Sequence, residues 1–552
     1  MDKLGQRIIK RFNSLKSEHS KWTAVWSDCA RYCLPIASPI TTLAHKSRGS
    51  VKKNPIDITG VLCRAKLDSF LFSATIYQGE QWFEIKARQK GKGRTSIIDT
   101  SLEKCLQDAS RVVLDAITNS NCIPTYQRFL RYYCTFGTGA FYTEFDDNDE
   151  LVCRQWSVPE GIYIAENSKG IPDTVYRAFA YTARQAIQEF GEENVSEDIR
   201  KASADEKEQD KVFNFIHAVY PRRKRDKRKK NPENKPIASV YVELNSHKVV
   251  MESGYDTMPY QTPRFYNNEE IYGRCPPMDA IPALKSINIA IESYLKNVEG
   301  MTKPLIFAPS DLYDRMSLEL GSINPWDSAR GEIKIWSPSG DVRSPLEFAN
   351  QKKEEVSAIF YNDVFQYLED RKNMTATEAQ LRYEEMIQGI SPVLANLHNE
   401  FFSPLIKRVA TELFARGKIN IPPQFRSKNG DMPDFEIVYN TRLDTKLKGV
   451  LNANVINFVR MVGELGVALG MPQLPSIYID VDKVVKGFAK NCNVTNDALR
   501  SDKDIKQRIE ALNQQQQQQI ILDKVKDIDV QKTPEQGSAQ DIMLNGGRYG
   551  KP

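Results

Sequence analysis

Apolar residues recur every three or four positions over residues 4–33, the period of one face of an α-helix. Leu4 opens this stripe and Cys33 closes it. Pro35 follows, and a proline ring removes a helical hydrogen bond and clashes with the preceding turn. The pattern therefore predicts one long N-terminal helix that ends before Pro35.

Three residues with metal-binding side chains lie on this stripe. His19 falls among its apolar positions, and Cys29 and Cys33 are one helical turn apart. Two thiols at this spacing could share a metal, but no second Cys/His pair lies nearby in the sequence, as a zinc site needs. We expect all three side chains to pack in the core, and we predict neither a metal site nor a cofactor.

The helical period returns several times before residue 140. It predicts a helix that begins at Asp57 or Thr59, both suitable capping residues, then a helix over 101–119 and another over 126–133. A short strand is expected at QWFEIKA, residues 81–87.

Residues 140–265 are rich in β-forming side chains. Short runs such as AFYTEF, VCRQW, GIYIAE, VFNFIHAVY, ASVYVEL and KVVME are separated by polar turns, which is typical of strands. One helix, Thr182–Phe190, interrupts them. Together with the helices, this region predicts an α+β fold that is mainly helical.

A helix–insert–helix arrangement follows. Apolar residues at helical spacing predict a helix over 277–300, closed by Gly300, and a second over 347–372. Between them, residues 301–346 form short β-like pieces. The two helices can run antiparallel, so the insert would project from one end of the pair.

Helices also dominate the remainder of the chain. Thr375 and Glu378 form a capping box, and helices continue to Arg416 with breaks at Pro392 and Pro404. After the strand DFEIVYN, helices are expected over 445–468 and 480–490. Residues 501–552 contain NQQQQQQ, and we predict a glutamine-rich helix and a disordered tail there.

Charge and cysteine content narrow the possible roles. The 552 residues include 76 Lys+Arg and 71 Asp+Glu, a net charge of +5, which permits contact with DNA but does not indicate tight binding. The nine cysteines are irregularly spaced, so we expect reduced thiols. The N-terminus resembles no signal peptide and no apolar run is long enough to span a membrane, so we predict synthesis in the cytoplasm and no membrane partner.

The motifs of common enzymes are absent. The sequence has no GxxxxGK[ST] phosphate loop, since GKGRTS at residues 91–96 lacks its ending, and no HExxH, CxxC pair or GxSxG. Nor do the carboxylates cluster as a two-metal nuclease requires. These absences argue against an ATP-driven motor and against a nuclease, and we predict that the protein is not an enzyme.

Nine short motifs together resemble the head-to-tail connector, or portal, family of short-tailed, T7-like phages. In chain order they are Trp26 with RYCLP (31–35), DITG (57–60), WF (82–83), FGTGA (136–140), PRF (263–265), IYGRCP (271–276), LKSIN (284–288), TATEA (375–379) and FFSPL (401–405). Each motif alone is weak, but their order over residues 20–410 is specific. The resemblance implies a ring-forming subunit with a wing, a stem, a clip and a crown.

The same resemblance implies a domain assignment. Residues 1–276 would be the wing, 277–300 and 347–372 the two stem helices, and 301–346 the clip. Residues 373–500 would supply the tunnel loop with wing and crown helices. The subunits would form a ring at the capsid vertex of the virion, typically a dodecamer, through which double-stranded DNA is packaged and ejected. The implied partners are the terminase large subunit, tail adaptor proteins, and the major capsid and scaffolding proteins.

Three groups of residues are candidate contact sites. The tunnel loop would place Arg371, Lys372, Asn373 and Met374 in the DNA channel. In the clip, Trp326 and Trp336 are candidate partner-binding residues, since aromatic side chains often dominate interfaces, although a role in the clip core is equally compatible. A basic run comprises Arg222, Arg223, Lys224, Arg225, Lys227, Arg228, Lys229 and Lys230. Such a run is usually a solvated loop, with a DNA-facing or partner-facing loop as the alternative.

Two other classes of function stay open at this point. One is a DNA-packaging enzyme subunit without recognisable motifs, which ATPase or nuclease activity would reveal. The other is a tail or internal virion protein that has no axial channel, which an image of the purified protein would distinguish from a ring.

Overall fold

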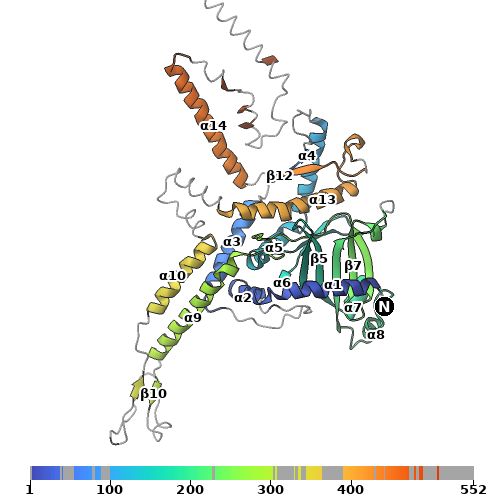
Figure 1. The fold of residues 1–552 in the computed structure, drawn as a ribbon, viewed down its shortest axis with the longest axis vertical. Coiled ribbons are helices and arrows are strands. Elements are labelled where there is room, and N and C mark those ends of the chain that lie inside the picture. Colours follow the sequence, from blue (N-terminus) through green and yellow to red (C-terminus); the bar gives the residue numbers. More distant parts are fainter. Residues whose placement is uncertain are drawn as a thin grey trace, which may run out of the picture. The chain divides into compact units, whose positions relative to one another are not determined.

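The computed structural model describes residues 3–37, 55–76, 81–88, 100–226, 231–302, 343–362, 389–427, 430–439 and 442–471, with short pieces at 305–307, 334–336 and a few isolated positions. Over these residues the chain is α+β and mainly helical, as predicted (Figure 1). It divides into two compact units, Met1–Leu443 and Asp444–Pro552.

The N-terminal segment forms two helices, so the prediction of one long helix is wrong. The helices are α1 (Lys3–Ser20) and α2 (Thr23–Cys33), and they are separated at Lys21 and Trp22. The apolar face of α1 packs on a β-sheet, whereas that of α2 enters the main core. A break between them is needed because the two faces meet different cores.

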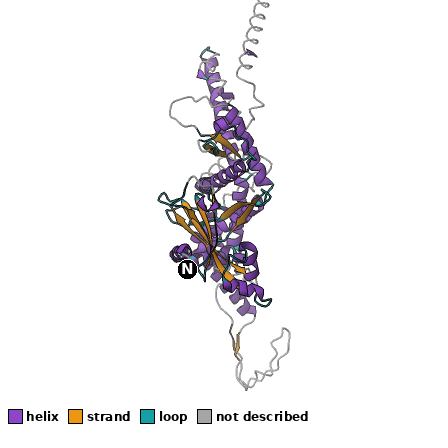
Figure 2. Cartoon of the chain, turned by 90° about the vertical axis from the view of Figure 1, so that its right-hand side faces the viewer, coloured by secondary structure: helices purple, strands orange, loops and turns teal. Residues whose placement is uncertain are grey.

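A five-stranded antiparallel sheet receives α1. Its strand order is β4-β5-β6-β7-β8, with β4 (Ile162–Glu166), β5 (Pro172–Thr182), β6 (Val212–Pro221), β7 (Ile237–Glu243) and β8 (Val249–Tyr255). The longest strand, β5, did not stand out in the sequence. Figure 1 shows α1 lying across one face of this sheet, and Figure 2 shows the sheet edge-on beside the N-terminus.

Two short helices pack on the other face of the sheet. They are α7 (Ala183–Phe190) and α8 (Glu197–Ala204). The predicted helix at Thr182–Phe190 is confirmed, with Thr182 as its N-cap: the Gln185 amide donates to the Thr182 hydroxyl, and the Gln185 side chain accepts from the Thr182 amide. Helix α8 was not predicted.

The remaining elements of the first unit surround the main core. The helices are α3 (Thr59–Thr75), α4 (Thr100–Thr118), α5 (Cys122–Phe136), α6 (Val158–Gly161) and α13 (Ser403–Ala415). A three-stranded sheet has the order β3-β2-β9, with β2 (Phe141–Phe145), β3 (Leu151–Gln155) and β9 (Tyr260–Gln261). Strand β1 (Phe83–Ala87) pairs antiparallel with β12 (Phe435–Tyr439), which joins two segments distant in sequence.

The second unit contains most of helix α14 (Arg442–Ala468), which agrees with the predicted helix over 445–468. Most of the expected helix over 480–490 lies outside the described residues, but Val484, Val485, Gly487 and Phe488 are described and are helical. Nearly all of the glutamine-rich C-terminus lies outside them. Among the helices of the described part, none combines the length and apolar character that crossing a membrane requires.

Candidate functional site

Two helices with a hairpin between them in the sequence form the most distinctive feature of the first unit. Helices α9 (Pro276–Thr302) and α10 (Ser344–Ile359) lie side by side, and β10 (Leu305–Phe307) pairs antiparallel with β11 (Lys334–Trp336) beyond their ends (Figure 1). The predicted helix–insert–helix arrangement is thus present in the described residues.

The second helix of the pair is shorter than the pattern predicts. Helix α10 ends at Ile359, where Phe360 caps it and Tyr361 adopts a left-handed backbone conformation with φ of 62°. A non-glycine residue in this region interrupts a right-handed helix. One unbroken helix over 347–372 is therefore wrong, and residues 363–388 lie outside the described part.

The pair of helices α9 and α10 is buried mainly where α9 begins, which is called the base of the pair here. The buried residues of α9 end at Ala290, whereas Ile289, Leu295 and Met301 are 65%, 50% and 51% exposed. Helix α10 buries only Ala349 and Val356 and exposes Leu346 and Phe348. Apolar side chains exposed in this number on adjacent helices indicate a surface that meets another protein.

Asp57 connects the pair to α3. Its backbone amide donates to Asn288 Oδ1 of α9 at 3.2 Å, and its carboxylate accepts from Lys353 Nζ of α10 at 2.7 Å. The carboxylate also accepts from the Thr59 amide at the start of α3. Burial by itself would raise the pKa of Asp57, but these hydrogen bonds outweigh it and lower the pKa. The DITG and LKSIN motifs therefore meet at one partly buried contact.

Close backbone packing brings the FGTGA and IYGRCP motifs together at the base of α9. A Cβ atom on Gly137, whose φ is +72°, would lie 2.2 Å from Gly273 O. Conversely, a Cβ atom on Gly273 would lie 2.5 Å from Gly137 O. The amide of Phe265, in the PRF motif, donates to Gly137 O at 2.8 Å. Only glycine permits this approach of two main chains just before α9 begins.

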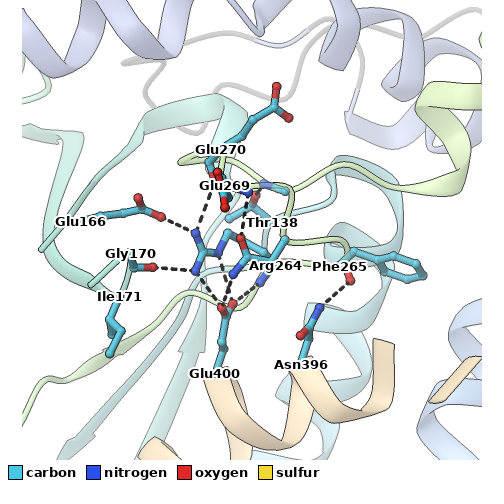
Figure 3. A network of polar contacts seen from close by, with 12 residues as sticks. Thr138, Glu166, Gly170, Ile171, Arg264, Phe265, Glu269, Glu270, Asn396 and Glu400 are labelled. Carbon is cyan, nitrogen blue, oxygen red and sulfur yellow. Dashed lines mark hydrogen bonds and ion pairs between the residues drawn. The ribbon is translucent and has the colours of Figure 1, made fainter. Parts of the chain in front are cut away.

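Arg264 is the centre of a buried polar network at the same place (Figure 3). Its side chain is 2% exposed and forms ion pairs with Glu166, at the end of β4, and with Glu400. Its guanidinium also donates to the backbone oxygens of Gly170 at 2.9 Å and Glu270 at 3.3 Å. A buried guanidinium needs such a full set of acceptors to offset its lost hydration. The network connects three parts of the first unit to one another. They are the five-stranded sheet, the segment that leads into α9, and the helical turn that carries Glu400.

Glu400 lies in a π-helical turn, His398–Phe402, directly before α13. The same turn places Phe401 against Phe129 of α5 at 4.8 Å and Phe402 against Trp82 at 5.0 Å between ring centroids. π-helical turns insert a residue into an α-helix and are frequent at functional positions. Here the extra residue lets one turn point Glu400 to the Arg264 network and two phenylalanines into the core.

A family model described as bacteriophage head to tail connecting protein matches residues 5–499. The chain belongs to this family. The portal protein of Salmonella phage epsilon15 is 26% identical over 502 residues, which cover 89% of this chain and 88% of that protein. The probable portal protein of Bordetella phage BPP-1 is 26% identical over 505 residues, covering 87% and 86%. The resemblance inferred from the nine motifs is confirmed.

Few of the contact residues expected in this head-to-tail connecting protein can be placed. Trp336 is the last residue of β11, paired in register with Leu305. Trp326 lies outside the described residues. So do Arg371, Lys372, Asn373 and Met374, the expected tunnel loop.

The basic run is placed in part, and one of its members has a structural role. Arg222 extends β6, forms an ion pair with Glu252 at 2.7 Å and donates to Ser253 O at 2.8 Å. It is therefore not a free cation of a solvated loop. Arg223, Lys224 and Arg225 are exposed, whereas Lys227, Arg228, Lys229 and Lys230 lie outside the described residues.

The candidate metal-binding side chains pack in the core, as predicted. Cys29 and Cys33 are fully buried, and burial raises the pKa of each thiol, that of Cys33 to about 12. His19 is buried between Trp26 and Tyr163, and Val158 O lies 3.0 Å from its Nε2. Burial lowers the pKa of His19, so its ring is neutral near pH 7.

Sequence reasoning missed the network around Arg264. The PRF motif was recognised, but neither Glu166 nor Glu400 was linked to it. Glu166 ends the strand-like run GIYIAE and Glu400 directly precedes the FFSPL motif, but both are distant in sequence from Arg264, and no local signal pairs either of them with it. A charged residue between Pro263 and Phe265, both of which suit a buried segment, is the one available hint.

Proposed function

We propose that this chain is a portal subunit, which forms a closed ring at one capsid vertex and provides the channel for DNA packaging and ejection. The observation that carries the proposal is the family match over residues 5–499, to which both portal relatives add near full-length similarity. A packaging enzyme without motifs and a virion protein without a channel are the alternatives that this match disfavours. The role is structural, so no catalytic activity is assigned to the chain.

The domain assignment is part of the proposal. Helices α9 and α10 form the stem, the segment 303–343 with β10 and β11 forms most of the clip, and the elements before Pro276 form the wing. Residues 369–377 form the tunnel loop beside the DNA, and the helices beyond it complete the wing and crown. The exposed apolar side chains of α9 and α10 support this assignment, because a ring subunit must bury faces against two neighbours.

The finer parts of the proposal concern the number of subunits in the ring and the partners that bind it. We expect a dodecamer located in the virion, with terminase large subunit and tail adaptor proteins bound at the clip. Major capsid and scaffolding proteins would contact the wing. Double-stranded DNA would pass through the axial channel without lasting attachment, since near-neutral balance over most of the chain limits the number of phosphate contacts.

Negative-stain microscopy and native mass spectrometry of the purified protein test the proposal. The expected result is a closed ring with an axial hole wide enough for a duplex. The double variant Ile289→Glu with Leu295→Glu should stay folded and lose rings, because two charges would enter the apolar contact between neighbours. Ile171→Glu, an equally exposed apolar position in the β4–β5 turn, is the matched control and should leave rings intact. Monomers alone at every concentration of the unaltered protein, with and without scaffolding protein, would refute the proposal.

A further inference from the structure

Helix α1 is strongly basic. Lys3, Arg7, Lys10, Arg11 and Lys16 are its cations, and Glu18 is its only carboxylate. Five positive charges against one negative charge give +4, whereas the whole chain has a net charge of +5. The rest of the protein sums to about +1, because the acidic residues elsewhere offset the other cations, including the basic run at 222–230.

These cations face solvent. All five are exposed, and within the described part of the chain none of them forms an ion pair with a carboxylate. Lys3, Arg7, Lys10 and Arg11 follow one another at spacings of four, three and one, so they form one stripe along the helix. The stripe spans about 12 Å of helix axis.

The opposite face of α1 fixes the stripe in place. Ile8, Phe12 and Leu15 are at most 5% exposed and pack on the five-stranded sheet. Near the start of the helix, a Cβ atom on Gly5 would lie 2.0 Å from His247 O, in the turn between β7 and β8. The cations therefore stand on a rigid support (Figures 1 and 2). Because the apolar face is buried, it cannot insert into a membrane as that of an interfacial helix would.

The exposed part of the basic run begins close to this stripe. The rings of Tyr176 and Tyr220 lie 6.4 Å apart on the face of the sheet that α1 covers. Burial and Tyr220 raise the pKa of Tyr176, and the positive charges of Arg11 and Arg7 oppose that rise, so both arginines lie nearby. Tyr220 is followed shortly by the exposed Arg223, Lys224 and Arg225. The exposed start of the basic run thus follows, by a few residues, a tyrosine on the sheet face that α1 covers.

The side chains on the outward face of α1 favour nucleic acid over protein as the anionic partner. None of the exposed large apolar side chains of the described residues lies on α1, and its other exposed positions are polar, such as Asn13, Ser14 and Ser17. A protein partner would need an apolar or aromatic centre to bind stably. The backbone of duplex DNA instead carries about one negative charge per 1.7 Å, and fixed cations are sufficient to bind it.

We propose that the outward face of α1, with the start of the basic run, binds the phosphate backbone of double-stranded DNA without sequence preference. This surface consists of other residues than the tunnel-loop residues assigned to the channel. It would bind duplex from outside the ring, where DNA need not slide through a closed channel and a longer contact is tolerated.

Covalently closed circular duplex DNA is the probe that isolates this surface, because a closed circle cannot thread an assembled ring. Binding of the purified full-length protein is measured as a function of KCl. We expect binding at about 100 mM KCl, with the logarithm of affinity falling by about 0.9 per phosphate contact for each tenfold rise in salt. The quadruple variant Lys3→Glu, Arg7→Glu, Lys10→Glu and Arg11→Glu should lose at least about tenfold in affinity and show a shallower salt dependence.

A matched variant controls for total charge. Lys104→Glu, Arg184→Glu, Lys207→Glu and Lys407→Glu make the same change in net charge at four exposed positions scattered over the first unit. This variant should keep most of the affinity and the salt slope. Equal loss in both variants, unchanged binding by the α1 variant, or no binding of circular DNA by the unaltered protein would each overturn the proposal. Polyglutamate that displaces DNA at equal charge concentration would also overturn it, in favour of an acidic protein partner. Ring formation is scored separately by mass photometry, so failure of the portal assignment is not confused with failure of this inference.

Discussion

Arg264 donates hydrogen bonds to both carboxylate oxygens of Glu400, through its side chain to Oε1 at 2.7 Å and through its backbone amide to Oε2 at 2.8 Å. The contact joins the segment leading into α9 to a π-helical turn more than a hundred residues later in the chain. It holds the base of one proposed stem helix against the rest of the core. Because the pair is buried, it matters more for this arrangement than an exposed ion pair would.

Removing the guanidinium should be costly. Arg264→Ala leaves the carboxylates of Glu166 and Glu400 without their cation in a site where Arg264 itself is 2% exposed. We expect a loss of about 3–5 kcal/mol in the free energy of unfolding, measured by urea denaturation. Arg274→Ala, which removes an exposed ion pair with Glu270, should cost less than about 1 kcal/mol. Equal stability of these two variants would contradict the assigned role of Arg264.

Two glycines allow the cost of a left-handed backbone conformation to be measured apart from the cost of a steric clash. Gly137 and Gly170 have φ of 72° and 70°, but only at Gly137 would a Cβ atom collide with another main chain. Gly170→Ala should therefore cost about 1–2 kcal/mol for the left-handed conformation alone. Gly137→Ala should cost several kcal/mol more, because Gly273 must move away. Thermal unfolding of both variants measures the difference, and similar melting temperatures would disprove the close approach.

His217 should make stability depend on pH. It is buried between Tyr241, stacked at 4.1 Å, and the hydroxyls of Ser239 and Tyr260. Burial, then the nearby Arg177 charge, lowers its pKa well below 6.5. The folded protein keeps the ring neutral while the unfolded chain takes up a proton below about pH 6.5, so stability falls as pH decreases through that value. Between pH 7.5 and 5.5 we expect a loss of about 1 kcal/mol from this group, and His217→Gln should remove that part of the slope.

The clip assignment predicts a separable loss of binding. Replacing residues 301–346 by a short Gly/Ser linker should leave the wing folded, because the main core includes no buried residue from this segment within the described part. Binding of tail adaptor and terminase proteins, measured by co-sedimentation, should be abolished. Trp336→Ala in the intact protein tests one side chain of this surface. Adaptor binding that persists in the linker variant would rule out this segment as the docking site.

The tunnel-loop assignment is tested at its two cations. Changing Arg371 and Lys372 together to Glu should leave ring formation intact while DNA packaging or retention falls, because repulsion replaces attraction near the DNA backbone. Asn373→Ala with Met374→Ala alters the neighbouring positions without changing charge and serves as the control. Normal packaging and normal retention in the charge-reversed variant would show that these residues do not contact the DNA.

Features that depend on contacts between residues close in sequence could be predicted from the sequence alone. The helix Thr182–Phe190 is one example, because its capping box involves Thr182 and Gln185, three residues apart. Helix α9 is another, since its buried positions recur at helical spacing from Met278 to Ala290. Such contacts form within one or two turns, so the pattern of side chains alone determines them.

Features that depend on contacts between residues distant in sequence were decided only by the tertiary structure. The apolar period ran unbroken through residues 4–33, yet the chain breaks at Trp22 because α1 faces the five-stranded sheet and α2 faces the main core. Strand β5 was missed because α1 and α7 cover opposite faces of it, which blurs the alternation that marks a half-buried strand. Arg264 and Glu400 meet only after folding, since no local rule relates charges separated by 136 positions. The sequence determined local helices and family membership, whereas long-range packing decided which charges are buried together.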